Sequence, residues 1–232
     1  MVKWWLWSYV GISAVAVLWF LRWSRNTKGI PRIAYLLVVV ILVWSLAWHL
    51  VMALGIGETG ADDRRISWAH YADWIVTAPL LLVALVLTAT HALSEKRAGL
   101  VLTLLLGSFP IILSGLAADL LVDEVARFAV YGVGMLGLGI VVALIWGPLR
   151  ATAEAQPSAM ASHFRLTALV LSVLWFCFPL VWILGPPGVG IVDAEASAVL
   201  FATLSALMKI GWSLLDIGRL RRLSDRGLLH VD

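Results

Sequence analysis

Seven apolar runs, each close to the thickness of a bilayer in length, are the feature that most limits how this chain can fold. They cover residues 4–22, 31–55, 68–90, 98–121, 127–149, 164–185 and 197–220. A helix rises about 1.5 Å per residue, so about 20 residues cross the hydrocarbon layer. The composition, 62 % hydrophobic and 13 % charged with a mean hydropathy of +0.96, excludes an ordinary soluble domain. Because the links are short, the sequence predicts an all-α membrane protein, a seven-transmembrane-helix bundle that forms one domain over residues 1–232.

The charged residues and the single cysteine indicate which partners, cross-links and membrane orientation to expect. The net charge of +3 comes from basic residues at the ends of the runs, so it predicts the lipid bilayer as partner and no nucleic acid. Cys177 lies within an apolar run and excludes a disulfide framework. With the N-terminus outside, twelve of the 17 Lys and Arg residues lie in inner loops and the tail, and four lie outside. Positive residues favour cytoplasmic loops, so we expect the N-terminus outside and the C-terminus in the cytoplasm.

Lys209, within the seventh run, is the most unusual residue. An ammonium group deep in the bilayer costs about 2.5–3.5 kcal/mol even on a lenient insertion scale. Such a lysine is expected to snorkel to an interface, to pair with a carboxylate, or to form a Schiff base, since a desolvated amine is a good nucleophile towards an aldehyde. Asp73 and Asp216 are the two deep carboxylates that could pair with it. A purely structural salt bridge stays open as an alternative.

Aromatic residues favour a binding pocket beside this lysine. Trp175, Phe178 and Trp182 recur three and four residues apart, so they share one face of the sixth predicted helix. Together with Trp74, which follows Asp73, they could enclose a flat conjugated ligand. An aromatic face taken alone is more often core packing, but the deep lysine and its carboxylates favour the ligand.

Three stretches and the lysine of the last run resemble the microbial (type I) rhodopsins, and among them the xenorhodopsin group most. The stretches are YADWIVTAPLLL in the third run, RFAVYG at the start of the fifth and VLWFCFPLVWILG in the sixth. The resemblance implies all-trans retinal, covalently attached to Lys209 as a protonated Schiff base, with Asp73 as its counter-ion. The lining that it implies for the cofactor pocket is Tyr71, Trp74, Thr77, Ile111, Gly115, Tyr131, Gly134, Leu138, Trp175, Phe178, Pro179, Trp182 and Ser205.

Departures from the outward proton pumps of this family are equally informative. Those pumps carry a carboxylate as proton donor eleven residues after the counter-ion, where this chain has Ala84. They usually have an arginine three residues before the counter-ion and an aspartate four residues before the lysine, where this chain has His70 and Ser205. Standard outward pumping is therefore not expected. Asp73 with Thr77 also differs from the third-helix motifs of the chloride and sodium pumps.

Asp216 favours transport in the opposite direction. Seven residues turn a helix by about 700°, which predicts that Asp216 lies on the face of Lys209 and about 10 Å nearer the cytoplasm. The xenorhodopsin resemblance then implies a light-driven inward proton pump, in which Asp216 is the cytoplasmic proton acceptor and Asp73 assists reprotonation from outside. Some xenorhodopsins pair this aspartate with a histidine of the second helix, but residues 35–40 contain none, and His49 lies deeper. A solvated helix-end aspartate is the alternative for Asp216.

Two other functions stay open. A photosensor, like the cyanobacterial sensory rhodopsin, shares the missing donor and the aspartate seven residues after the lysine, and it would need a transducer as partner. A transporter or receptor with a structural Lys–Asp pair would bind no chromophore. None of these is an enzyme. The resemblance also implies a homo-oligomer, a trimer, in the plasma membrane of a prokaryote.

Overall fold

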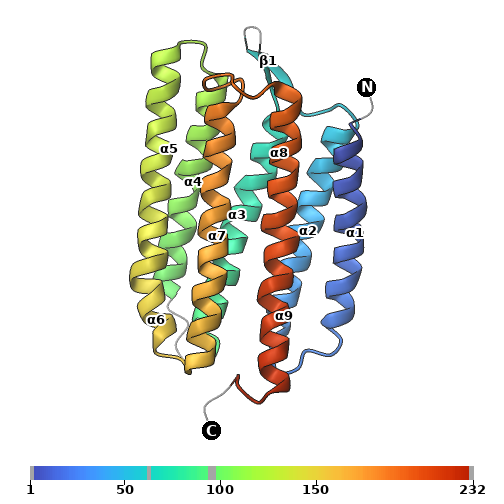
Figure 1. The fold of residues 1–232 in the computed structure, drawn as a ribbon, viewed down its shortest axis with the longest axis vertical. Helices are drawn as coiled ribbons and strands as arrows, with labels where there is room; N and C mark the ends of the chain where they lie inside the picture. The colour runs from blue at the N-terminus through green and yellow to red at the C-terminus, as the bar shows by residue number, and fades with distance from the viewer. Residues whose placement is uncertain (1–2, 62–63, 94–97, 230–232) are drawn as a thin grey trace.

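The computed structural model describes residues 3–61, 64–93 and 98–229 as a bundle of long helices with one short hairpin (Figure 1). In chain order the elements are α1 (Trp4–Trp23), α2 (Arg32–Ala53), β1 (Thr59–Ala61), β2 (Arg64–Ile66), α3 (Trp68–Ala89), α4 (Ala98–Leu120), α5 (Glu124–Leu144), the π-helical turn η1 (Ile145–Leu149), α6 (Arg150–Glu154), α7 (Ser158–Leu184), α8 (Ala194–Ala206), the π-helical turn η2 (Leu207–Gly211) and α9 (Trp212–Asp225). The segments α5–η1–α6 and α8–η2–α9 are each continuous, so each forms one long rod.

Seven stretches within the described residues are long and apolar enough to cross a membrane. They correspond one by one to the seven apolar runs, which confirms the predicted seven-helix bundle. Lys96 and Arg97, which the orientation argument counts on the inner side, lie outside the described residues.

Three spans begin earlier than the apolar runs, because the first turn of each is polar. The fifth and seventh spans follow Asp123 and Asp193, whose side chains accept a hydrogen bond from a first-turn backbone N–H at 2.7 and 2.8 Å. Such caps satisfy donors that a helix start leaves unpaired. The sixth span begins at Ser158 instead of residue 164, directly after Pro157. Hydropathy alone could not place these starts.

The two ends of the bundle are distinguished by what they carry (Figure 1). One end, called here the hairpin end, holds the antiparallel pair β1–β2, in which Thr59 lies opposite Ile66. The other, called here the tail end, is where α9 ends at Asp225. Every residue of the candidate site can be placed between these two ends.

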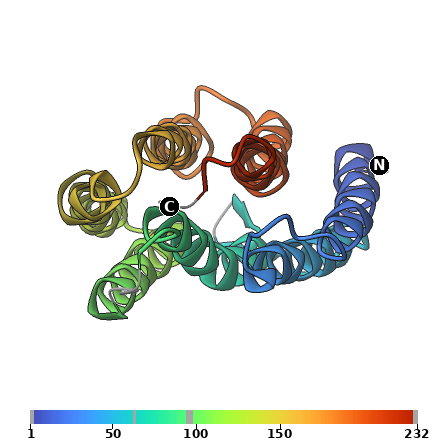
Figure 2. The ribbon, with the colours of Figure 1, turned by 90° about the horizontal axis from the view of Figure 1, so that it is seen from below.

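Helix α3 is the central element of the bundle. Seen along the helices in Figure 2, α1 to α4 form one row, and α5, α7 and the α8–η2–α9 rod form a second row facing it. In its most apolar stretch α3 has 61 % of its residues buried, against 22–39 % in the other spans. Side chains on α3 are therefore enclosed by both rows of helices.

Candidate functional site

Lys209 lies inside the bundle and forms an ion pair with Asp73. Both side chains are completely buried, and Lys209 Nζ donates a hydrogen bond to Asp73 Oδ2. The snorkelling alternative is wrong, because the side chain is directed to a carboxylate of α3 instead of the membrane surface. Lys209 also sits within η2, and π-helical turns occur frequently at functional sites.

Ser45 of α2 connects the members of this pair. Its hydroxyl donates to Asp73 Oδ2 at 3.0 Å and accepts from Lys209 Nζ at 3.0 Å. The hydroxyl of Tyr9 lies 2.6 Å from Ser45 Oγ. Since the Ser45 proton is directed to Asp73, Tyr9 is the donor in this contact. The buried charges are thus surrounded by hydrogen bonds, which offset the cost of removing them from water.

Two histidines flank Asp73 towards the hairpin end. His49 Nδ1 donates to the Ser45 carbonyl at 2.8 Å and lies 3.8 Å from Asp73 Oδ2, while its ring stacks on Tyr9. His70 is buried and stacks on Trp74 with a centroid separation of 5.7 Å. His49 is therefore a hydrogen-bonded core residue next to the ion pair.

A second group of polar residues lies on the tail side of Lys209, around Asp216. Asp216 is 3 % exposed, so the solvated helix-end alternative is wrong. Its Oδ1 accepts hydrogen bonds from Thr88 Oγ1 and from His163 Nε2, each at 2.9 Å. Lys209 lies in the middle of η2, and the wider winding of a π turn makes the rotation between Lys209 and Asp216 smaller than in a regular helix. Asp216 therefore faces α3 and α7.

Sequence reasoning missed His163. It lies one residue before the predicted sixth run, in the polar first turns of α7 that hydropathy excluded. The sequence did carry a signal, since His163 and Thr167 are four residues apart and so share one helix face. The structure shows both side chains fully buried. The pairing of His163 with a residue 53 positions later, however, could not be read from spacing.

A cavity of about 140 Å³ adjoins Asp216 on the tail side. It is lined by Asp216, Thr88 and Ala84 within the bundle and extends to Ile30 and Pro31 at the tail end. One water needs about 10–15 Å³ of such space, so the cavity has room for several. Water there could connect Asp216 with the tail end.

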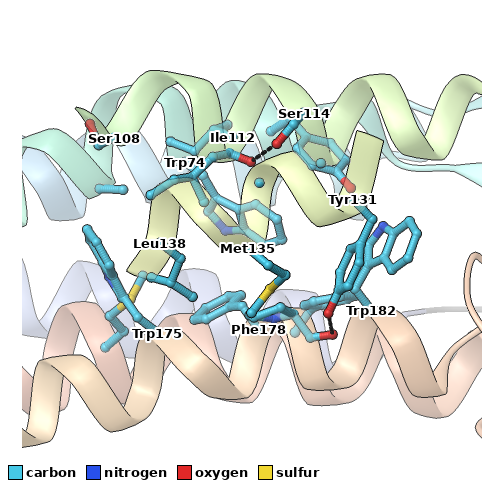
Figure 3. Close-up of a pocket in the computed structure, with 18 residues that line it drawn as sticks. Trp74, Ser108, Ile112, Ser114, Tyr131, Met135, Leu138, Trp175, Phe178 and Trp182 are labelled. Atoms are coloured by element: carbon cyan, nitrogen blue, oxygen red, sulfur yellow. Dashed lines mark hydrogen bonds between the residues drawn. The ribbon is translucent and has the colours of Figure 1, made fainter. Parts of the chain in front are cut away.

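A separate, apolar pocket runs between the two rows of helices (Figure 3). Its lining includes Tyr71, Trp74, Ile111, Gly115, Tyr131, Gly134, Leu138, Trp175, Phe178, Pro179 and Trp182 from the sequence-based expectation. The structure adds Ala78, Ser108, Ile112, Ser114, Met135, Phe201 and Met208. Met208, the neighbour of Lys209, marks one part of the lining, and the residues of α4 and α5 form the part on the far side of the bundle from η2.

Two residues expected in this pocket lie elsewhere. Thr77 is fully buried and donates from Oγ1 to the Asp73 carbonyl at 2.9 Å. Ser205 is also fully buried, and its Oγ has no hydrogen-bond partner among the described residues. Neither lines the pocket, and Lys209 itself is turned to Asp73.

Two glycines keep the pocket wide where α4 and α5 approach it. A Cβ at Gly115 would lie 3.1 Å from Tyr71 Cε1, and one at Gly134 would lie 2.4 Å from Ser114 Oγ. The pocket thus has flat aromatic walls, small residues at close approaches and a buried amine next to its lining. These features fit a flat conjugated aldehyde.

Besides the two deep carboxylates that the sequence predicts, the structure shows a further buried one near the end of a span. Asp119, in the last turn of α4, is 7 % exposed. Tyr71 and Trp182, which line the apolar pocket, both donate hydrogen bonds to it. Its position four residues after Gly115, on the pocket face of the same helix, was a readable signal.

Comparisons with known proteins give one consistent result. The family model described as bacteriorhodopsin-like protein matches residues 1–222. Sensory rhodopsin-2 of Natronomonas pharaonis is 32 % identical over 205 residues, covering 88 % of this chain and 82 % of that protein. Bacteriorhodopsin of Halobacterium salinarum is 30 % identical over 219 residues, covering 91 % and 81 %. The crystal structure of thermophilic rhodopsin from Rubrobacter xylanophilus superimposes with a TM-score of 0.90 at 32 % identity, covering 98 % of this chain and 99 % of that one.

Proposed function

This chain belongs to the bacteriorhodopsin-like family of microbial rhodopsins, and on that premise we propose that it is a light-driven inward proton pump of the xenorhodopsin type. Its relatives include light-driven pumps and photosensors, so the membrane-spanning bundle serves transport or light sensing and is no enzyme. The retinal-binding residues, the direction of transport, the trimer and the outside position of the N-terminus are parts of the proposal.

The proposed cofactor is all-trans retinal on Lys209. When bound, it would supply light absorption and carry the transported proton on its Schiff-base nitrogen. The pocket residues fit it, since they are apolar and largely aromatic and the lining passes next to Lys209. Trp74, Trp175 and Phe178 would hold the conjugated chain, and Gly115 and Gly134 would make room for its bulkier end.

The residues on either side of the Lys209 nitrogen have different tasks in this proposal. Asp73 holds the positive charge in the dark through the direct ion pair and the Ser45 hydrogen bonds. Asp216, about 10 Å further along the rod, is the acceptor when the proton leaves on the tail side. His163 and Thr88 orient its carboxylate, and the adjoining cavity offers a path for water to the tail end.

The observation that supports the inward direction best is the burial of Asp216 in this polar cluster. An intramembrane carboxylate that does not neutralise the lysine is costly, and such residues commonly mark ion or proton pathways. Ala84, which lines the same cavity, offers no carboxyl group in the donor position of the outward pumps. With the N-terminus outside, the tail end is cytoplasmic, and protons that pass Asp216 enter the cell.

The test is the light-induced pH change in an unbuffered suspension of cells that express the protein with added retinal. Alkalinisation that a protonophore abolishes is the expected result. Acidification would overturn the direction. As a control for the cofactor, Lys209→Ala is expected to give colourless cells without a light response, whereas Lys28→Ala, which changes the exposed Lys28–Asp225 pair, should leave the colour unchanged.

A photosensor is the second candidate, favoured by the 32 % identity with sensory rhodopsin-2. It would need a transducer to receive the signal. Coloured cells that give no pH change in light, together with a slow photocycle of the purified protein, would favour this function over the pump.

A further inference from the structure

Asp119 is a buried carboxyl group that the proposed proton route does not use. It lies at the hairpin end of the bundle, whereas Asp216 lies towards the tail end. No ion pair among the described residues includes it. A buried carboxyl group is costly, and an asparagine or leucine could fill the same space, so the presence of the acid requires an explanation.

Its hydrogen bonds join three helices at the apolar pocket. Tyr71 of α3 donates from its hydroxyl to Asp119 Oδ2 at 2.5 Å, and Trp182 of α7 donates from Nε1 to Oδ1 at 2.9 Å. The indole N–H can only donate, and both carboxyl oxygens accept. An ionised carboxyl group can accept both of these hydrogen bonds.

The two donors are walls of the pocket. The Tyr71 ring lies against Gly115, and the Trp182 ring stacks on Tyr131 with a centroid separation of 4.5 Å and an interplanar angle of 13°. All four residues line the part of the pocket formed with α4 and α5, on the far side of the bundle from η2 and Lys209. Figure 3 shows Tyr131 and Trp182 side by side at one end of this pocket. Asp119 is hydrogen-bonded to the Trp182 ring of this pair.

We propose that Asp119 is a specificity-determining residue of the chromophore pocket. Its carboxylate fixes the rings of Tyr71 and Trp182 and places a negative charge beside the part of the chromophore farthest from Lys209. This inference rests on the proposed function, because it needs a conjugated cation attached to Lys209.

The charge predicts the direction of a colour shift. Light moves positive charge in a conjugated Schiff-base cation away from the nitrogen and towards the far end of the chain. A negative charge near that far end attracts the excited state more strongly than the ground state. Asp119 therefore shifts the absorption maximum to longer wavelength, whereas Asp73, next to the nitrogen, acts in the opposite sense.

The experiment compares visible absorption spectra of purified protein reconstituted with all-trans retinal. Asp119→Asn keeps the shape of the side chain and removes the charge, and it is expected to shift the maximum to shorter wavelength. Glu124→Gln is the matched control, since it removes an exposed carboxylate at the same end of the bundle and should leave the spectrum unchanged. An unchanged or longer-wavelength maximum in Asp119→Asn overturns the proposal.

A second pair of variants covers the case in which Asp119→Asn forms no pigment. Asp119→Glu and Asp119→Gln have side chains of equal length and differ in charge, and the Glu variant is expected to absorb at longer wavelength than the Gln variant. Equal maxima overturn the charge effect. A wild-type protein that stays colourless with retinal contradicts the proposed cofactor instead, and a coloured wild type that moves no protons contradicts the pump while the spectral comparison still holds.

Discussion

The two polar clusters on either side of Lys209 differ in how their carboxylates are held. Asp73 is bound by a cation and by Ser45, and its surroundings are filled by Tyr9 and His49. Among the residues that the structure describes, His163 is the only basic side chain within ion-pair distance of Asp216, and Asp216 borders a cavity. One carboxylate is therefore fixed by charge, and the other is held by hydrogen bonds next to space for water.

This difference explains how two aspartates in one bundle could have different roles, one as a fixed counter-ion and the other as a proton acceptor. A carboxylate in direct contact with a cation favours the charged form of both groups, which in the proposed pump stabilises the dark state. A carboxylate with a histidine, a threonine and a cavity around it can take up a proton and pass it on, because its partners can rearrange around either form. The same contrast predicts that variants in the Asp73 cluster and in the Asp216 cluster have different effects.

The largest expected effect is on stability, and it concerns Asp73. Asp73→Asn leaves the ammonium group of Lys209 buried without its anionic partner, which typically costs about 3–5 kcal/mol. Unfolding of the retinal-free protein in mixed detergent micelles would measure this loss. Asp216→Asn should cost only about 1 kcal/mol, since the amide oxygen can still accept from Thr88 and His163 and no ion pair with Lys209 is lost. Equal losses in the two variants would contradict the distinction between the clusters.

The next effect is on transport, and it concerns Asp216. Asp216→Asn cannot accept a proton, so the initial rate of light-induced alkalinisation should fall at least about tenfold, equivalent to about 1.4 kcal/mol. Asp225→Asn is the matched control, because Asp225 lies on the same helix but pairs with Lys28 at the exposed tail end. If both variants transported at the wild-type rate, Asp216 would not be the acceptor.

A smaller effect is expected from the histidine beside it. His163→Gln can keep a hydrogen bond to Asp216 but cannot take up a proton, and we expect the transport rate to fall about fivefold, equivalent to about 1 kcal/mol. Arg165→Gln, an exposed neighbour on α7, should have no effect. A wild-type rate in His163→Gln would show that the ring only positions the carboxylate.

The smallest effect should come from Thr88. Thr88→Val removes one of the two hydrogen bonds to Asp216 Oδ1 and leaves the His163 bond in place. We expect less than about 1 kcal/mol in unfolding free energy and a change in transport rate below about twofold, both from the same assays. A loss as large as that of Asp216→Asn would mean that Thr88 is part of the proton path itself.

The sequence predicts the apolar features of this protein better than its polar ones. The seven spans follow from apolar runs, because a bilayer requires continuous helices of fixed length. The aromatic lining follows from residues three and four apart, as Trp175, Phe178 and Trp182 show. The polar starts of helices could not be placed in this way, and His163 was missed for that reason.

Long-range polar pairs were the least predictable part. Asp216 and His163 meet because α7 and α9 lie side by side, and nothing in their separate sequences fixes that contact. Asp119 was overlooked because it lies near the hairpin end of its run, where a carboxylate is usually solvated. The partners that distinguish it, Tyr71 and Trp182, are 48 and 63 residues away.

The π-helical turn at Lys209 has a consequence for how this protein is compared with its relatives. The additional residue in η2 changes the phase of α9 with respect to α8 by about 100°. A chain that lost one residue there would regain a regular helix, but α8 and α9 could not both keep their present neighbours. Lys209 lies in the middle of this turn, so the seven residues from Lys209 to Asp216 include part of it. A relative with an unbroken helix would turn the residues of its α9 to different neighbours relative to those of its α8, although an alignment would score the positions as the same.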